Sequence, residues 1–169
     1  MDISLIILTV ESKQEGVFPV LMELAFMCKD LSFDKTRAKE LLQNIDVNQE
    51  FADPEHGIKT TLLNWAATWS NVPMAELLLQ HGADPNLIYD NGTENALWNL
   101  QYADGESADE NQRRLKIVQL ILENGADPHL QIEGEDLLLW AISYWGEDEG
   151  IQSDYREEFI RLLEEYEKW

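Results

Sequence analysis

The sequence is poor in cysteine and has no long apolar run. The only cysteine, Cys28, lies in an apolar segment, so the chain can form neither an intramolecular disulfide nor a cysteine-rich zinc site. A reducing compartment fits this composition. No apolar stretch approaches the roughly 18 residues that a membrane-spanning helix needs. The apolar stretch Ile3–Val10 follows Asp2 rather than a basic residue, and no small-residue cleavage site comes after it. We therefore expect a soluble, cytoplasmic protein.

Basic residues are also scarce. The 169 residues include 12 Lys and Arg against 33 Asp and Glu, for a net charge of -21. Such a chain repels nucleic-acid phosphates and anionic lipids, so neither is expected as a partner. Residues 57–169 are the more acidic part, with 22 acidic and 7 basic residues. The charge favours a basic or neutral partner.

Motifs of catalysis and metal binding are missing as well. His56, His81 and His129 form no i, i+4 pair and have no cysteine partner. No glycine-rich dinucleotide motif, Walker loop or nucleophile elbow occurs. Neighbouring carboxylates in so acidic a chain are typical of a solvated surface. We expect no cofactor, no metal and no enzymatic activity; an acid-dependent hydrolase is the enzymatic alternative.

What the sequence does contain is an internal repeat. The stretch Leu77–Asn86, LLLQHGADPN, recurs as Leu120–His129, LILENGADPH. Each copy reads as the apolar end of a helix, a glycine suited to a left-handed C-cap, and an Asp-Pro turn. A weaker copy ends in Asp46-Val47-Asn48.

With Thr61–Ala67, TLLNWAA, upstream of the first copy, this pattern resembles the ankyrin repeat, whose motifs are T-P-L-H-x-A-A and L-L-x-x-G-A-D-x-N. The chain departs from the family at the proline, replaced by Leu62, Ala96 and Leu137, and at the histidine, replaced by Asn64, Trp98 and Leu139. The family's histidine bridges neighbouring turns, so the finger register must here be held by other groups.

The resemblance implies an all-α, ankyrin-repeat-like helical solenoid of about four helix pairs with short finger loops or hairpins. We expect a single domain: residues 1–48 hold the N-terminal helices and first unit, 49–86 unit 2, 87–129 unit 3, and 130–169 unit 4 and a polar-backed C-terminal cap. Residues 3–13 fit either a strand or a helix, and we favour a helix. Asp34, Asn71 with Pro73, Ser107 with Glu110, and Asp154 are expected to begin helices.

Units 3 and 4 each exceed the family spacing by nine residues, between their two helices. Because stacked repeats place equivalent loops on one edge, the two insertions predict an acidic ledge. Its members are Asp104, Glu106, Glu147, Asp148 and Glu149.

In ankyrin proteins the concave surface includes the end of each inner helix. Carried over, those positions are Thr68 and Trp69, Tyr102 and Ala103, and Ser143 and Tyr144, with Trp145 alongside. Aromatic residues anchor many protein interfaces, so we expect a partner-binding groove here. The alternative is that these rings continue the packing between repeats, as we expect for Trp65 and Trp140.

The first hypothesis for function is thus a non-catalytic protein–protein interaction module. Its partner would be a basic or neutral protein held by an aromatic concave face with an acidic rim. The alternative is a bacterial immunity or inhibitor-type protein that neutralises a basic toxin or nuclease. We expect a monomer.

Overall fold

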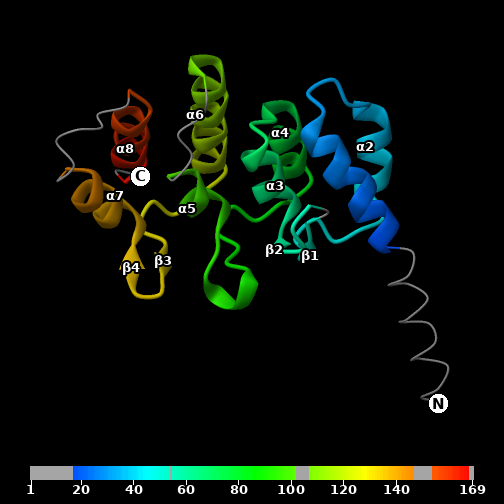
Figure 1. Ribbon diagram of the computed structural model, residues 1–169, viewed down its shortest axis with the longest axis horizontal. Helices are drawn as coiled ribbons and strands as arrows, with labels where there is room; N and C mark the ends of the chain where they lie inside the picture. The colour runs from blue at the N-terminus through cyan, green and yellow to red at the C-terminus, as the bar shows by residue number, and fades with distance from the viewer. Residues whose placement is uncertain (1–16, 54, 102–106, 147–153, 168–169) are drawn as a thin grey trace, which may run out of the picture.

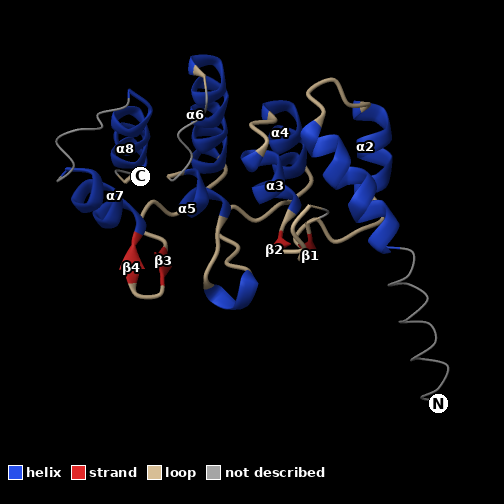
Figure 2. Cartoon of the chain, viewed as in Figure 1, coloured by secondary structure: helices blue, strands red, loops and turns tan. Residues whose placement is uncertain are grey.

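The computed structural model describes residues 17–53, 55–101, 107–146 and 154–167 (Figure 1). The chain is mostly helical, as predicted, and the strands within these ranges form two small antiparallel pairs (Figure 2). A helix over residues 17–29 is followed by the remaining elements in this order: α2 (Lys35–Leu42), β1 (Phe51–Ala52), β2 (Lys59–Thr60), α3 (Leu62–Thr68), α4 (Val72–Gln80), η1 (Asp90–Gly92), α5 (Ala96–Leu100), α6 (Ala108–Glu123), β3 (Gln131–Ile132), β4 (Glu135–Asp136), α7 (Leu137–Gly146) and α8 (Asp154–Tyr166).

The helices lie side by side as pairs, in the order of the sequence (Figure 1). Helix α3 packs on its partner α4 and on α5 of the next pair, while α4 packs on α6 and α6 on α8. The inner helices are therefore α3, α5 and α7, and the outer helices are α4, α6 and α8. The hairpins β1–β2 and β3–β4 and the loop that contains η1 project together beyond one end of the helices, as fingers (Figure 1).

Most helices begin where the sequence predicts. The Asp34 carboxylate accepts hydrogen bonds from the amides of Thr36 and Arg37, and the Asn71 side chain accepts one from Met74. Ser107 caps α6 by accepting from the Glu110 amide. Helix α6 has 16 residues and α4 only 9, so part of the extra length predicted for the third unit lies in its second helix.

The two Gly-Ala-Asp copies end their helices in the same way. Gly82 and Gly125 have φ angles of 88° and 91°, in the left-handed region that the sequence predicts for these C-caps. After each glycine, the alanine amide donates to a carbonyl of the last turn: Ala83 to Leu78 at 3.0 Å and Ala126 to Ile121 at 3.2 Å. Both helices thus stop in a Schellman motif, which turns the chain toward the next finger.

The side chains of Asn48 and Asn86 tie each turn to the next one. The amide of Asn48 donates to the Gly82 carbonyl at 3.2 Å, and its oxygen accepts from the Asp84 amide at 2.8 Å. Asn86 makes the equivalent bonds to Gly125, at 2.9 Å, and Asp127, at 2.8 Å. These asparagines hold successive turns in register, a task that the family's bridging histidine performs elsewhere in the repeat.

One continuous apolar core runs along the stack between inner and outer helices. Trp65 is buried in it and donates from Nε1 to the Ala25 carbonyl at 3.1 Å, while Trp140 is partly buried and packs against Trp98 with ring centroids 6.1 Å apart. Both tryptophans are core residues, as predicted. The helix expected within residues 3–13 and the acidic ledge lie outside the described residues, and the four unit boundaries stay predictions.

Candidate functional site

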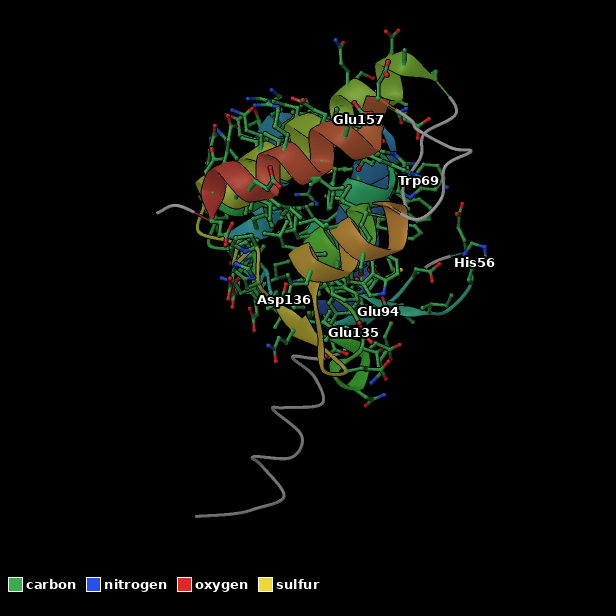
Figure 3. The ribbon with its side chains drawn as sticks, turned by 90° about the vertical axis from the view of Figure 1, so that its left-hand side faces the viewer. His56, Trp69, Glu94, Glu135, Asp136 and Glu157 are labelled. Atoms are coloured by element: carbon green, nitrogen blue, oxygen red, sulfur yellow. The ribbon has the colours of Figure 1, made fainter. Side chains whose placement is uncertain are left out.

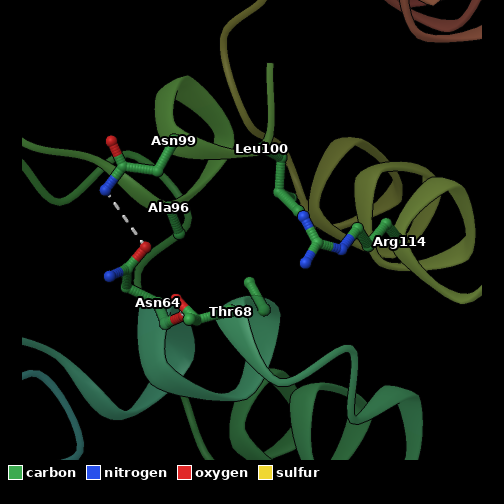
Figure 4. Close-up of a pocket in the computed structure, with 7 residues that line it drawn as sticks. Asn64, Thr68, Ala96, Asn99, Leu100 and Arg114 are labelled. Atoms are coloured by element: carbon green, nitrogen blue, oxygen red, sulfur yellow. Dashed lines mark hydrogen bonds between the residues drawn. The ribbon is translucent and has the colours of Figure 1, made fainter. Parts of the chain in front are cut away.

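The inner helices α3 and α5 and the fingers beside them line a continuous groove. It consists of two hollows of about 180 Å³ each, which share Asn64, Thr68 and Asn99. The first hollow, shown in Figure 4, is completed by Ala67, Ala96, Leu100 and Arg114. The second is completed by the finger residues Asp53, His56, Ile58, Lys59, Thr60, Tyr89 and Glu94, and by Trp65. These residues are called the groove below.

Two asparagines from successive units form the polar floor of the groove. The Asn99 side-chain amide donates to the Asn64 oxygen at 3.2 Å and to the Tyr89 hydroxyl at 3.0 Å (Figure 4 shows the first bond). The Asn64 amide in turn donates to Thr60 Oγ1 at 3.0 Å. Burial raises the pKa of the Tyr89 phenol, so it stays neutral. The floor is a fixed row of amide and hydroxyl groups that joins both fingers to both inner helices.

Trp69 lies at the C-cap of α3, next to Thr68 on the rim of the groove. Its ring packs edge-on against the buried Trp65, with centroids 5.9 Å apart and planes at 73°. The side chain nevertheless stays 37% exposed, and Thr68 is exposed as well. Trp69 and His56 lie along the same side of the molecule (Figure 3). Trp69 therefore combines a rigid seat with an accessible ring, which suits an interface anchor.

A cation of the chain itself occupies the face of this ring. Lys29 Nζ lies 4.2 Å from the Trp69 ring centroid, and the same ammonium group pairs with the Glu55 carboxylate of the first finger. The ring face therefore already acts as a cation acceptor. Sequence reasoning missed this contact because Lys29 and Trp69 are 40 positions apart and belong to different helix pairs.

Arg114 of α6 borders the first hollow beside Leu100 (Figure 4). Its guanidinium donates to Ser70 Oγ at 3.1 Å and to the Glu110 carboxylate at 2.8 Å. The arginine side chain is only 14% exposed, so this ion pair is partly withdrawn from water. It links the end of the α3 unit to the α6 helix of the next unit and fixes one wall of the hollow.

The groove carries mixed charge in its described part. Burial alone would raise the pKa of Asp53, but the amides of His56, Glu55 and Ile58 donate to its carboxylate and together lower that pKa. Asp53 thus organises the finger loop. Lys59 lies 3.7 Å from Glu50. Among the described residues, Glu94 is the groove carboxylate that makes no hydrogen bond or ion pair through its side chain.

Of the predicted site residues, Thr68 and Trp69 are the two whose side chains the structure places. The backbone of Tyr144 and Trp145 lies in α7, and their side chains are outside the described part. Tyr102, Asp104, Glu106, Glu147, Asp148 and Glu149 are also outside it. Four groove residues were not predicted from the sequence as site residues: Asn64, Asn99, Tyr89 and Glu94. The signal was the substitution of Asn64 for the family's histidine, which leaves a polar side chain at the inner face.

Groups suited to chemistry are few in the described residues. Burial raises the pKa of the Cys28 thiol, which disfavours the reactive thiolate. No group of three or more His, Cys, Asp or Glu residues in the described ranges could hold a metal ion. In the same part of the chain, no helix is both long and apolar enough to cross a bilayer.

One comparison with known proteins matches part of this region. Residues 59–90 match the family model of the ankyrin repeat. They extend from β2 through α3 and α4 to the turn at Asn86 and the start of the next finger. No curated protein matches the chain. Ankyrin repeats are in general modules of protein–protein interaction and are typically not enzymes. The chain therefore contains an ankyrin repeat at residues 59–90, as its sequence predicted.

Proposed function

We propose that this protein binds a partner protein through the groove, with Trp69 as the aromatic anchor at its rim. The proposal takes the helix pairs as one ankyrin-type solenoid whose inner helices and fingers form the binding face. The observation that carries it is the groove itself, in which residues of two successive units surround two adjoining hollows of about 180 Å³ each. A solenoid binds along a surface of this kind because its repeats add equivalent side chains side by side.

Each part of the groove suits a different group of a partner segment. The first hollow is walled by Ala67, Ala96 and Leu100 and accommodates an apolar side chain. Asn64 and Asn99 present amide groups for polar or main-chain atoms, since each amide keeps hydrogen-bonding capacity beyond the bonds described above. A lysine or arginine of the partner would reach Glu94, which lacks an ionic partner in the described part.

Charge favours a basic or neutral partner. The net charge of -21 attracts a positively charged protein over a distance and speeds the encounter. The predicted acidic ledge of residues 104, 106 and 147–149 would strengthen this attraction. The described groove holds both signs of charge, so we assign most of the holding energy to the aromatic and apolar contacts and the rate of encounter to the overall charge.

The experiment that tests the proposal is a capture of partners with the intact, tagged protein, read by mass spectrometry at low and moderate salt. A captured protein is then produced, and its affinity for the wild type and for two variants is measured by calorimetry. Trp69→Ala should weaken binding at least about tenfold, as expected for an aromatic anchor. Glu94→Gln should mainly slow association.

Two matched controls separate the groove from general effects. Leu31→Ala removes an exposed apolar side chain outside the groove, and Glu164→Gln removes an exposed carboxylate on α8. Neither should change the affinity by more than about twofold, since surface contacts outside an interface contribute little. If the groove variants bind the partner as well as the wild type while remaining folded, the binding face lies elsewhere.

The inhibitor hypothesis is a narrower form of the same proposal, in which the partner is a basic toxin or nuclease. Its support is the acidic charge alone. It requires that the affinity fall steeply with added salt, because the Debye length shrinks to about 3 Å at 1 M. In both forms the protein acts as a monomer.

A further inference from the structure

The same two register positions of the inner helices are buried in α3 and α5 but exposed in α7. Three and six residues after the residue that precedes each helix lie Asn64 and Ala67 in α3, and Trp98 in α5 with Gln101 at its C-cap. All four side chains are exposed to 9% or less. In α7 these positions are Leu139 and Ile142, which are 63% and 41% exposed. Two aliphatic side chains thus occupy the most exposed sites of the series.

The neighbouring helices explain the burial in the first two cases. Asn64 and Ala67 face Ala96, Asn99 and Leu100 of α5 across the first hollow. Trp98 of α5 packs against Trp140 of α7. In α7 the corresponding side chains, Leu139 and Ile142, are exposed and are not packed against the apolar core in the described part of the chain. Together they form a stripe at the positions through which an inner helix elsewhere in this molecule packs against the next inner helix.

The surroundings of this stripe are strongly acidic. Residues 130–146 and 154–167, which form the β3–β4 hairpin, α7 and α8, contain nine acidic and two basic residues. Figure 3 looks at this end of the molecule, with Glu157 on α8 above and Glu135 and Asp136 of β4 below it. Arg161 is already bound to Glu158 and Glu165. An apolar stripe bordered by carboxylates is complementary to an apolar helix face bordered by cations.

We propose that the α7 stripe, Leu139 and Ile142, docks an amphipathic helix of a partner protein that carries lysine or arginine beside its apolar face. The helix takes the place that the next inner helix holds against α3 and α5. Its apolar residues therefore follow the spacing of Ala96, Asn99 and Leu100, namely i, i+3 and i+4. A second copy of this chain is disfavoured as the occupant, because the acidic ends of two copies repel one another. This surface is separate from the groove and does not depend on the function proposed for it.

The probe is a synthetic peptide of about 16 residues, long enough to form a helix on binding. It carries leucine at i, i+3, i+4 and i+7 and lysine on its other face. One control peptide has glutamate in place of lysine, and a second has the same composition with the leucine spacing broken. We expect the intact protein to bind the lysine peptide at least about tenfold more tightly than either control, by calorimetry. In nuclear magnetic resonance spectra, the shifted amide signals should cluster on α7.

The residues at the equivalent positions of α3 suggest a test variant. Leu139→Asn with Ile142→Ala installs the pair found in α3, and both sites are exposed, so the fold should persist, as judged by circular dichroism. We expect this double variant to bind the lysine peptide at least about tenfold more weakly, while Leu31→Ala and Trp69→Ala bind it normally. Equal binding by the double variant, or equal binding of the lysine and glutamate peptides, overturns the proposal. So does a dimer in analytical ultracentrifugation that the double variant abolishes, since the occupant would then be a second copy.

Discussion

Asn48 and Asn86 each make the same two hydrogen bonds to the turn of the next unit. Each side chain donates to a glycine carbonyl and accepts from an aspartate amide two residues later, with distances between 2.8 and 3.2 Å. Each asparagine also closes an Asx turn, in which its backbone amide donates a hydrogen bond to the side chain of Asp46 or Asp84. The Asp-x-Asn sequence thus builds a turn and presents a side chain to the next unit.

Replacing Asn86 with alanine should therefore destabilise the fold by about 1–3 kcal/mol, because two hydrogen bonds between units are lost at about 1 kcal/mol each. Asn48→Ala should act similarly. Urea unfolding followed by circular dichroism measures the change. Asn124→Ala is the matched control: its side-chain amide bonds the Leu120 carbonyl of its own helix and joins no two units. A control loss as large as that of Asn86→Ala would contradict the assignment.

These asparagines illustrate how far the sequence could predict the fold. The Gly-Ala-Asp repeat predicted left-handed glycines at 82 and 125, since few residues other than glycine end a helix in this conformation. The capping residues Asp34, Asn71 and Ser107 were equally predictable from local chemistry. The bonds of Asn48 and Asn86 were not predicted, because each joins residues 34 to 41 positions apart and depends on how one turn sits above the next.

The candidate site, too, could be predicted from the sequence only in part. The resemblance predicted Thr68 and Trp69 at the end of an inner helix, and they lie at the end of α3, while their part in binding stays a prediction. It could not predict that Lys29 covers the Trp69 ring, nor that Asn64 and Asn99 meet across two units. The exposure of Leu139 could not be predicted either, since the equivalent residues Asn64 in α3 and Trp98 in α5 are buried. Exposure there depends on whether another helix packs against α7, and the pattern of a single unit does not contain that information.

The last of the three equivalent turns has histidine in place of asparagine, which makes it sensitive to pH. His129 Nδ1 lies 2.9 Å from Asp136 Oδ2, and its Nε2 lies 3.4 Å from Glu167 Oε1 at the end of α8. The hydrogen bond with Asp136 raises the pKa of His129 above its ordinary value of 6.5, and the smaller effect of burial opposes it. Asp136 also caps α7 through the Leu139 amide, so the protonated histidine links the cap to α8.

The contribution of His129 to stability should be complete below about pH 6.5 and should be lost as the pH rises through its raised folded-state pKa. His129→Asn installs the residue of the equivalent turns and should flatten the stability curve in this window. Urea midpoints at several pH values between 5 and 8.5 measure the effect. In the control His81→Gln the replaced ring contacts the Leu77 carbonyl and no carboxylate in the described part. An unchanged pH profile in His129→Asn would show that the contact with Asp136 contributes nothing.

Replacing Trp65 and replacing Trp69 should lower the stability of the fold by very different amounts, although the two rings are in contact. Trp65 is buried and donates to the Ala25 carbonyl, so Trp65→Ala should destabilise the fold by about 3–5 kcal/mol. Trp69 is 37% exposed and loses mainly its edge contact with Trp65, so Trp69→Ala should lower stability by only about 1 kcal/mol. Thermal and urea unfolding of both variants give the comparison. Equal losses would assign Trp69 to the core and remove the anchor from the proposed groove.

Lys29 should compete with a basic partner for the face of Trp69. Its ammonium group lies 4.2 Å from the ring centroid and also pairs with Glu55. Lys29→Met keeps the length of the apolar stem but leaves both the ring face and the Glu55 carboxylate open to a cation of the partner. The affinity for a basic partner captured by the groove should then rise about two- to fivefold, as expected for a cation–π contact of about 0.5–1 kcal/mol.

Lys35→Met on α2 removes the same charge from an exposed site on another helix and serves as the control. An equal rise in both variants would mean that only the net charge had changed, whereas a rise confined to Lys29→Met would place the partner's cation on the Trp69 ring.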